Sequence, residues 1–119
     1  MDDKNFWYIA CESKDLNHNR PLSTRLFDEW LVLFRNEKGQ ATALQDRCLH
    51  RSSQLSRGHV INGCLRCPYH GWTYNGDGEV VQIPSEGPSQ PRSHKQALSF
   101  PVIEQEGYKP TFIKDLAAA

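Results

Sequence analysis

The sequence predicts an all-β domain, on three observations. Short runs of aromatic and β-branched residues follow one another closely, turn sequences separate them, and no stretch of a dozen residues repeats apolar side chains at the helical period of 3.6. Short strands at such intervals are typical of a β-sandwich or a small barrel. The 119 residues also suffice for one hydrophobic core, so we expect residues 1–119 to form a single domain.

The first half of the chain contains one candidate strand and one candidate hairpin. Residues 6–11 are mostly aromatic or aliphatic, which favours a strand. Residues 30–34 are apolar throughout, which predicts a strand buried on both faces, and Trp7 and Trp30 are candidates for the core. The sequence Asn-Glu-Lys-Gly then predicts a turn, so that residues 30–45 form a hairpin.

Two further hairpins are expected in the second half. Asn62-Gly63 joins candidate strands at 59–61 and 64–66, and Asn-Gly favours a type I′ turn because both central residues need a positive φ. The second hairpin joins residues 72–74 to 79–82 through Asn-Gly-Asp-Gly. The remaining segments are a proline-containing surface loop and two last strands, over residues 84–93, 100–103 and 108–113.

Composition excludes several classes of partner. The chain has 14 Lys and Arg against 14 Asp and Glu, so its net charge of zero favours neither nucleic acid nor an anionic membrane. The longest apolar run, residues 30–34, is far too short to span a bilayer. The polar start Met1-Asp2-Asp3-Lys4 is unlike a secretion signal. We therefore expect a cytoplasmic protein whose cysteines serve metal or redox chemistry rather than disulfides.

Two short motifs carry that chemistry, Cys48-x-His50 and Cys67-x-x-His70. Sixteen residues separate them and contain the Asn-Gly hairpin, which can bring the two loops side by side. Thiolates and imidazoles together suit zinc or iron. Zinc fingers usually pair two cysteines and then two histidines, whereas here each loop supplies one of each. That distribution suits a diiron centre with two cysteines on one iron and two histidines on the other.

Two zinc sites are the alternatives to an iron–sulfur centre. One is a structural site that uses the same four residues, as part of an interaction module without redox activity. The other uses Cys64 and Cys67 together with Cys48 and His50, and requires the Cys64 side chain to face the site. Cys11 and Cys64 are otherwise expected to pack as small apolar residues.

The double motif, with the continuation Cys67-Pro68-Tyr69-His70-Gly71-Trp72, resembles the N-terminal Rieske iron–sulfur domain of the terminal (alpha) subunits of ring-hydroxylating oxygenases. The resemblance runs from about Phe6 to Phe112. It implies an all-β, Rieske-type β-sandwich with a small cluster-binding subdomain, about residues 46–75, that two ligand loops form. The implied cofactor is one 2Fe–2S cluster, and the implied function is one-electron transfer.

The resemblance also implies roles for individual residues. Cys48 and Cys67 would hold the buried iron, and His50 and His70 the outer one. Around these metal and cofactor ligands, it implies supporting roles for Arg51, Trp72 and Tyr74, with Trp72 limiting water beneath the cluster and Tyr74 donating a hydrogen bond toward a ligand sulfur.

Four positions depart from the patterns of related proteins. Ser52 stands where these oxygenases commonly have glycine. Ser53 and Tyr69 stand where the Rieske proteins of respiratory complexes have a cysteine pair, and Trp72 replaces their serine donor to the cluster. Fewer hydrogen bonds to sulfur favour the oxidised state, so we expect a midpoint potential of roughly −150 mV rather than +300 mV.

The remaining histidines, His18, His59 and His94, are scattered and predict no second metal site. We therefore expect the electron-transfer part of an oxygenase, without the mononuclear iron site that would make the chain an enzyme by itself. The expected partners are a flavin or ferredoxin reductase and an oxygenase catalytic domain or component. The alternative is a free-standing Rieske ferredoxin that carries electrons from a reductase to an oxygenase.

Overall fold

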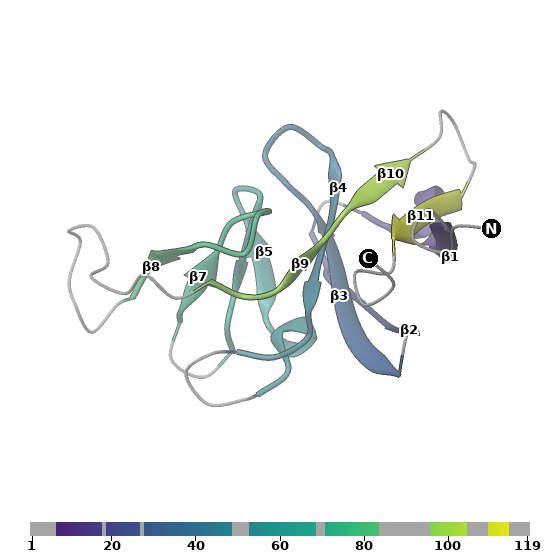
Figure 1. Ribbon diagram of the computed structural model, residues 1–119. Helices are drawn as coiled ribbons and strands as arrows, with labels where there is room; N and C mark the ends of the chain where they lie inside the picture. The colour runs from purple at the N-terminus through teal and green to yellow at the C-terminus, as the bar shows by residue number, and fades with distance from the viewer. Residues whose placement is uncertain are drawn as a thin grey trace.

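The described part of the chain forms three antiparallel sheets, of which the middle one packs against both others (Figure 1). The computed structural model describes residues 7–17, 19–26, 28–48, 53–68, 71–83, 96–104 and 110–114. Within these ranges the helical elements are two single 3-10 turns, η2 and η3, at Ser13–Asp15 and Leu55–Arg57. No helix among the described residues is long and apolar enough to cross a membrane.

The middle sheet has the strand order β2-β3-β4-β9, and its strands are Leu22–Leu26, Glu29–Arg35, Ala41–Gln45 and Ser99–Phe100. Strand β3 is buried on both faces, because Leu31, Val32, Leu33 and Phe34 are all fully inaccessible to solvent. Side chains of a strand alternate between its faces, so Leu31 and Leu33 enter one core while Val32 and Phe34 enter the other. The prediction of a doubly buried strand is confirmed for these four residues.

The second sheet has the order β1-β11-β10 and packs on one face of the middle sheet (Figure 1). Its strands are Trp7–Glu12, Pro110–Lys114 and Val102–Glu104. The segment expected as one strand over 100–103 is split at Pro101, which separates β9 in the middle sheet from β10 in the second sheet. Proline has no N–H to donate to a ladder, and this break lets the chain change sheets.

The third sheet has the order β5-β6-β7-β8 and packs on the opposite face of the middle sheet (Figure 1). Its strands are His59–Ile61, Cys64–Arg66, Thr73–Tyr74 and Val80–Gln82, close to the predicted hairpins. Asn62 and Gly63 have φ values of 52° and 76°, as the type I′ turn requires. This sheet and the middle sheet enclose the core that contains Cys48 and Cys67.

The expected core positions of Trp7 and Trp30 need correction. Trp7 and Trp30 are 36% and 49% exposed and do not belong to the core. Trp30 lies opposite Arg25 in the β2–β3 ladder, with the guanidinium carbon 5.9 Å from its ring centre. Strand β2 itself was not predicted, because its five residues have a leucine at each end, three polar residues between them and no aromatic side chain. The proline-containing loop falls outside the described residues.

One ion pair ties the middle sheet to the second sheet. Arg35 on β3 donates to both carboxylate oxygens of Glu104 on β10, at 2.9 and 2.7 Å, and to the carbonyl oxygens of Ser13 and Leu16. These bonds to the charged carboxylate lower the pKa of Glu104 below its ordinary value of 4.5, with the Arg35 hydrogen bond as the largest cause.

We predict that Glu104→Gln lowers the free energy of unfolding at neutral pH by about 1–2 kcal/mol, because it weakens a half-buried bidentate pair. Since folding lowers the pKa of Glu104, its contribution is complete above the unfolded value near 4.5 and is lost as pH falls through the lower folded value. Urea denaturation at neutral and acidic pH checks this, and the difference between the two proteins should shrink in acid.

Glu12→Gln is the matched control, because Glu12 pairs with Lys14 at 3.3 Å where both side chains are well exposed. We expect no measurable loss for this variant. Equal effects of the two substitutions would contradict the role given to Glu104.

Candidate metal centre

The first candidate ligand loop begins just after β4. Cys48 is fully buried in the core between the middle and third sheets. Its N–H donates to the carbonyl oxygen of Ser53 at 2.7 Å, so the described residues on either side of 49–52 are joined by a backbone hydrogen bond. His50 and Arg51 come between these two residues in the sequence and lie outside the described residues.

The second candidate loop is closed in the same way. Cys67 follows β6, is 3% exposed and lies in the same core as Cys48. Its N–H donates to the carbonyl oxygen of Trp72 at 2.7 Å, so each cysteine bonds the carbonyl five residues further on. His70 lies between these two ends and is also outside the described residues. The two loops therefore begin from one core and share one kind of closure.

Each cysteine sulfur has a hydroxyl group from the other part of the site within hydrogen-bonding distance. Tyr74 on β7, after the second loop, places its Oη 3.3 Å from Sγ of Cys48 in the first loop. Ser53, at the end of the first loop, places its Oγ 3.6 Å from Sγ of Cys67 in the second loop. The contact predicted between Tyr74 and a candidate ligand sulfur is thus present, whereas the Ser53 contact was not anticipated.

Trp72 and Asp46 support the two loops from different sides. Trp72 is half-buried and packs against the core that contains both cysteines. Asp46 is 5% exposed and accepts hydrogen bonds from the Ser56 N–H at 2.7 Å and the Ser56 hydroxyl at 2.6 Å. It also accepts a longer bond of 3.4 Å from the hydroxyl of Ser23 on β2. Asp46 therefore holds η3 against the start of the first loop.

Sequence reasoning did not identify this role of Asp46. Asp46 and Ser56 are ten positions apart, and no periodicity connects them. The one available signal was the position of Asp46, two residues before a candidate ligand, where an acidic residue could bond the backbone of the returning chain.

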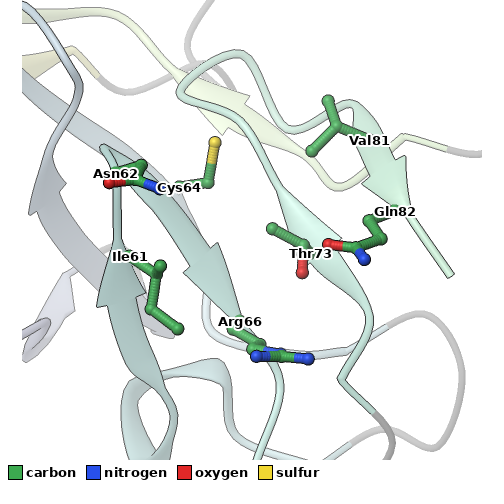
Figure 2. Close-up of a pocket in the computed structure, with 7 residues that line it drawn as sticks. All are labelled: Ile61, Asn62, Cys64, Arg66, Thr73, Val81 and Gln82. Atoms are coloured by element: carbon green, nitrogen blue, oxygen red, sulfur yellow. The ribbon is translucent and has the colours of Figure 1, made fainter. Parts of the chain in front are cut away.

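Cys64 lies on the other face of the third sheet. In β6, Leu65 points into the core with the two buried cysteines, so Cys64 and Arg66 face the opposite way. Figure 2 shows both among the residues that line an outer cavity of about 350 Å³. Burial is the larger cause, and the negative charge of Glu37 the smaller one, of a raised pKa for the Cys64 thiol. This position disfavours the zinc site that required Cys64 to join Cys67.

The described part of the donor set fits a metal centre whose buried side has two thiolate ligands. Cys48 and Cys67 form no disulfide, are enclosed in one apolar core, and each has a hydroxyl near its sulfur. No group of three or more potential metal ligands gathers among the residues that the structure describes, a range that includes two of the four predicted ligands.

Comparison with known proteins gives a family match over most of the chain. The family model for the Rieske [2Fe-2S] domain matches residues 6–104. The oxygenase component of dicamba O-demethylase from Stenotrophomonas maltophilia is 39% identical over 103 residues, which are 87% of this chain and 30% of that protein. Chloroplastic chlorophyllide a oxygenase from Chlamydomonas reinhardtii is 46% identical over 82 residues, which are 69% of this chain and 13% of that protein.

Solved structures agree with the sequence match. The crystal structure of apo dicamba monooxygenase superposes with a TM-score of 0.83 at 37% identity, over 98% of this chain and 35% of that one. The three-sheet arrangement is therefore that of a Rieske-type β-sandwich, as predicted. The chain spans about a third of the length of the two dicamba proteins and an eighth of the algal one.

We predict that Asp46→Ala lowers the free energy of unfolding by about 2–3 kcal/mol, because the Ser56 N–H and hydroxyl lose their charged acceptor in a largely buried place. Urea denaturation of the purified protein measures the loss. Asp15→Ala, at an exposed position of η2, is the control and should leave stability unchanged. If both variants unfolded at the urea concentration of the parent, Asp46 would not anchor the loop.

Proposed function

The chain belongs to the Rieske [2Fe-2S] domain family, and from this membership we propose that it transfers single electrons as the Rieske domain of a ring-hydroxylating, non-haem iron oxygenase. The cofactor of this family is one Rieske-type 2Fe–2S cluster, which accepts and donates one electron at a time. The observation that carries the proposal is the pair of buried cysteines at the bases of two identically closed loops.

We assign Cys48 and Cys67 to the buried iron and His50 and His70 to the outer iron. Burial of the two cysteines supports their half of the assignment, because two thiolates in an apolar core need a cation to balance their charge. His50 follows Cys48 by two residues and His70 follows Cys67 by three, so both histidines remain within about 7–11 Å of their cysteines along an extended chain. Two neutral imidazoles in place of thiolates raise the potential of such a centre.

The surrounding residues would control the environment of the cluster. Tyr74 and Ser53 supply hydroxyl groups toward the sulfurs, and Trp72 covers part of the core from water. Arg51, next to His50 in the sequence, is proposed as a further supporting residue. We further propose that residues 46–75 form the cluster-binding subdomain of a single domain over 1–119.

The role within an oxygenase is favoured over that of a free ferredoxin by the identity of the relatives. The dicamba and chlorophyllide proteins are named as oxygenases, and this chain matches a minor part of their length. The proposed partners are a flavin or ferredoxin reductase and an oxygenase catalytic domain or component. We propose a cytoplasmic location, although the relatives include chloroplastic proteins.

Metal analysis and a coupled assay test the proposal. We expect two irons and two acid-labile sulfides per chain, and reduction of the visible chromophore by a reductase and its pyridine nucleotide. One zinc and no chromophore would instead indicate the structural module. The chain can also be added to a separate, complete oxygenase that lacks its own ferredoxin. If the chain then supports turnover by that oxygenase, the ferredoxin role is favoured.

We predict that His50→Ser and His70→Ser each abolish the native visible and electron paramagnetic resonance spectra, because each removes a ligand of the outer iron. His59→Ser is the matched control, since His59 is exposed on β5 and should be dispensable. Retention of the native spectra in either ligand variant would refute the assignment of that histidine.

We predict that the midpoint potential falls with pH at alkaline values. A ligand imidazole whose second ring nitrogen takes up a proton on reduction couples the electron to that proton. Uptake of one proton per electron gives a slope of about 59 mV per pH unit. Redox titrations from neutral to strongly alkaline pH measure this slope, and a constant potential over the whole range would contradict exposed histidine ligands.

A further inference from the structure

Ser53 contacts both ligand loops at once. Its carbonyl oxygen accepts the Cys48 N–H at 2.7 Å, which fixes the Ser53 backbone at the base of the first loop. Its Oγ lies 3.6 Å from Sγ of Cys67 at the base of the second loop. Among the described residues, this sulfur is the side-chain atom within hydrogen-bonding distance of the Ser53 hydroxyl.

We propose that Ser53 is a positioning residue that tunes the potential of the cluster through a hydrogen bond from its hydroxyl to Sγ of Cys67. The proposal rests on the assignment of Cys67 as a ligand in the proposed function. A ligand thiolate has no proton, so the hydroxyl must be the donor in this contact. Once Cys67 binds metal, the Ser53 hydroxyl is therefore the donor and the Cys67 sulfur is the acceptor.

The direction of the effect follows from charge. Reduction adds one negative charge to the cluster and its ligands, and a hydrogen bond to a more negative sulfur is stronger. The Ser53 hydroxyl therefore stabilises the reduced form more than the oxidised form and raises the midpoint potential. Because Cys67 is only 3% exposed, little water is available to replace this donor.

The contact of Tyr74 with Cys48 can be compared with that of Ser53 with Cys67. Its hydroxyl makes the shorter contact of 3.3 Å with Cys48, and Tyr74 is fully buried. Each contact joins the two parts of the site. Ser53, at the end of the first loop, contacts Cys67 in the second, and Tyr74, which follows the second loop, contacts Cys48 in the first. Ser53 stands where respiratory Rieske proteins have a disulfide cysteine, and in this chain it makes a polar contact with the proposed ligand Cys67.

The test is a redox titration of the cluster-loaded chain. We expect Ser53→Ala to lower the midpoint potential. The equilibrium constant for reduction should fall threefold to tenfold, and a tenfold fall corresponds to about 59 mV for one electron. Ser53→Thr should retain a potential near that of the parent, since it keeps the hydroxyl. Ser23→Ala is the matched control, because its hydroxyl lies 3.4 Å from Asp46 and supports the same loop without touching a candidate ligand sulfur.

Ser53→Val and Ser53→Thr form a second, nearly isosteric pair that serves if the alanine variant does not assemble its cluster. A lower potential for valine than for threonine supports the proposal, and equal potentials overturn it. An intact cluster with an unchanged potential in Ser53→Ala also overturns it, and leaves the ligand assignment standing. A native spectrum in Cys67→Ser would instead refute the proposed ligand set.

Discussion

The burial of β3 on both faces is the constraint on which the rest of the structure depends. Leu31 to Phe34 are fully inaccessible to solvent, and successive residues enter different cores. A shift of one residue in the ladder would exchange the two sets, so the pairing of β3 with β2 and β4 is strongly specified. That pairing fixes where β4 ends, and the end of β4 delivers Asp46 and Cys48 to the candidate metal centre.

The two cores have different tasks. The core toward the second sheet contains Leu16 and Ile113, and the adjacent Arg35–Glu104 pair joins two sheets without contributing to the candidate metal centre. The core toward the third sheet contains both buried cysteines as well as ordinary apolar residues. Packing that stabilises this core therefore also positions the two candidate sulfur ligands.

Two backbone hydrogen bonds and two hydroxyl contacts define the surroundings of the buried cysteines before any metal is considered. The backbone bonds of Cys48 and Cys67 define the loop bases, while Tyr74 on β7 approaches the sulfur of Cys48 and Ser53 approaches the sulfur of Cys67. Polar groups inside an apolar core interact strongly because water screens them little. This arrangement suits a centre that must accept and release an electron without rearranging its protein ligands.

The sequence by itself determined the features that depend on near neighbours. It predicted the all-β class, the positive φ angles of Asn62 and Gly63, and the candidate ligand loops from the spacing of cysteine and histidine. The tertiary structure alone decided the exposure of Trp30, the bonds of Asp46 to Ser56, and the contact between Ser53 and Cys67. These features join residues ten or more positions apart, or depend on which side of a strand another sheet covers. Local propensity and spacing contain no information on such contacts, because packing between sheets creates them.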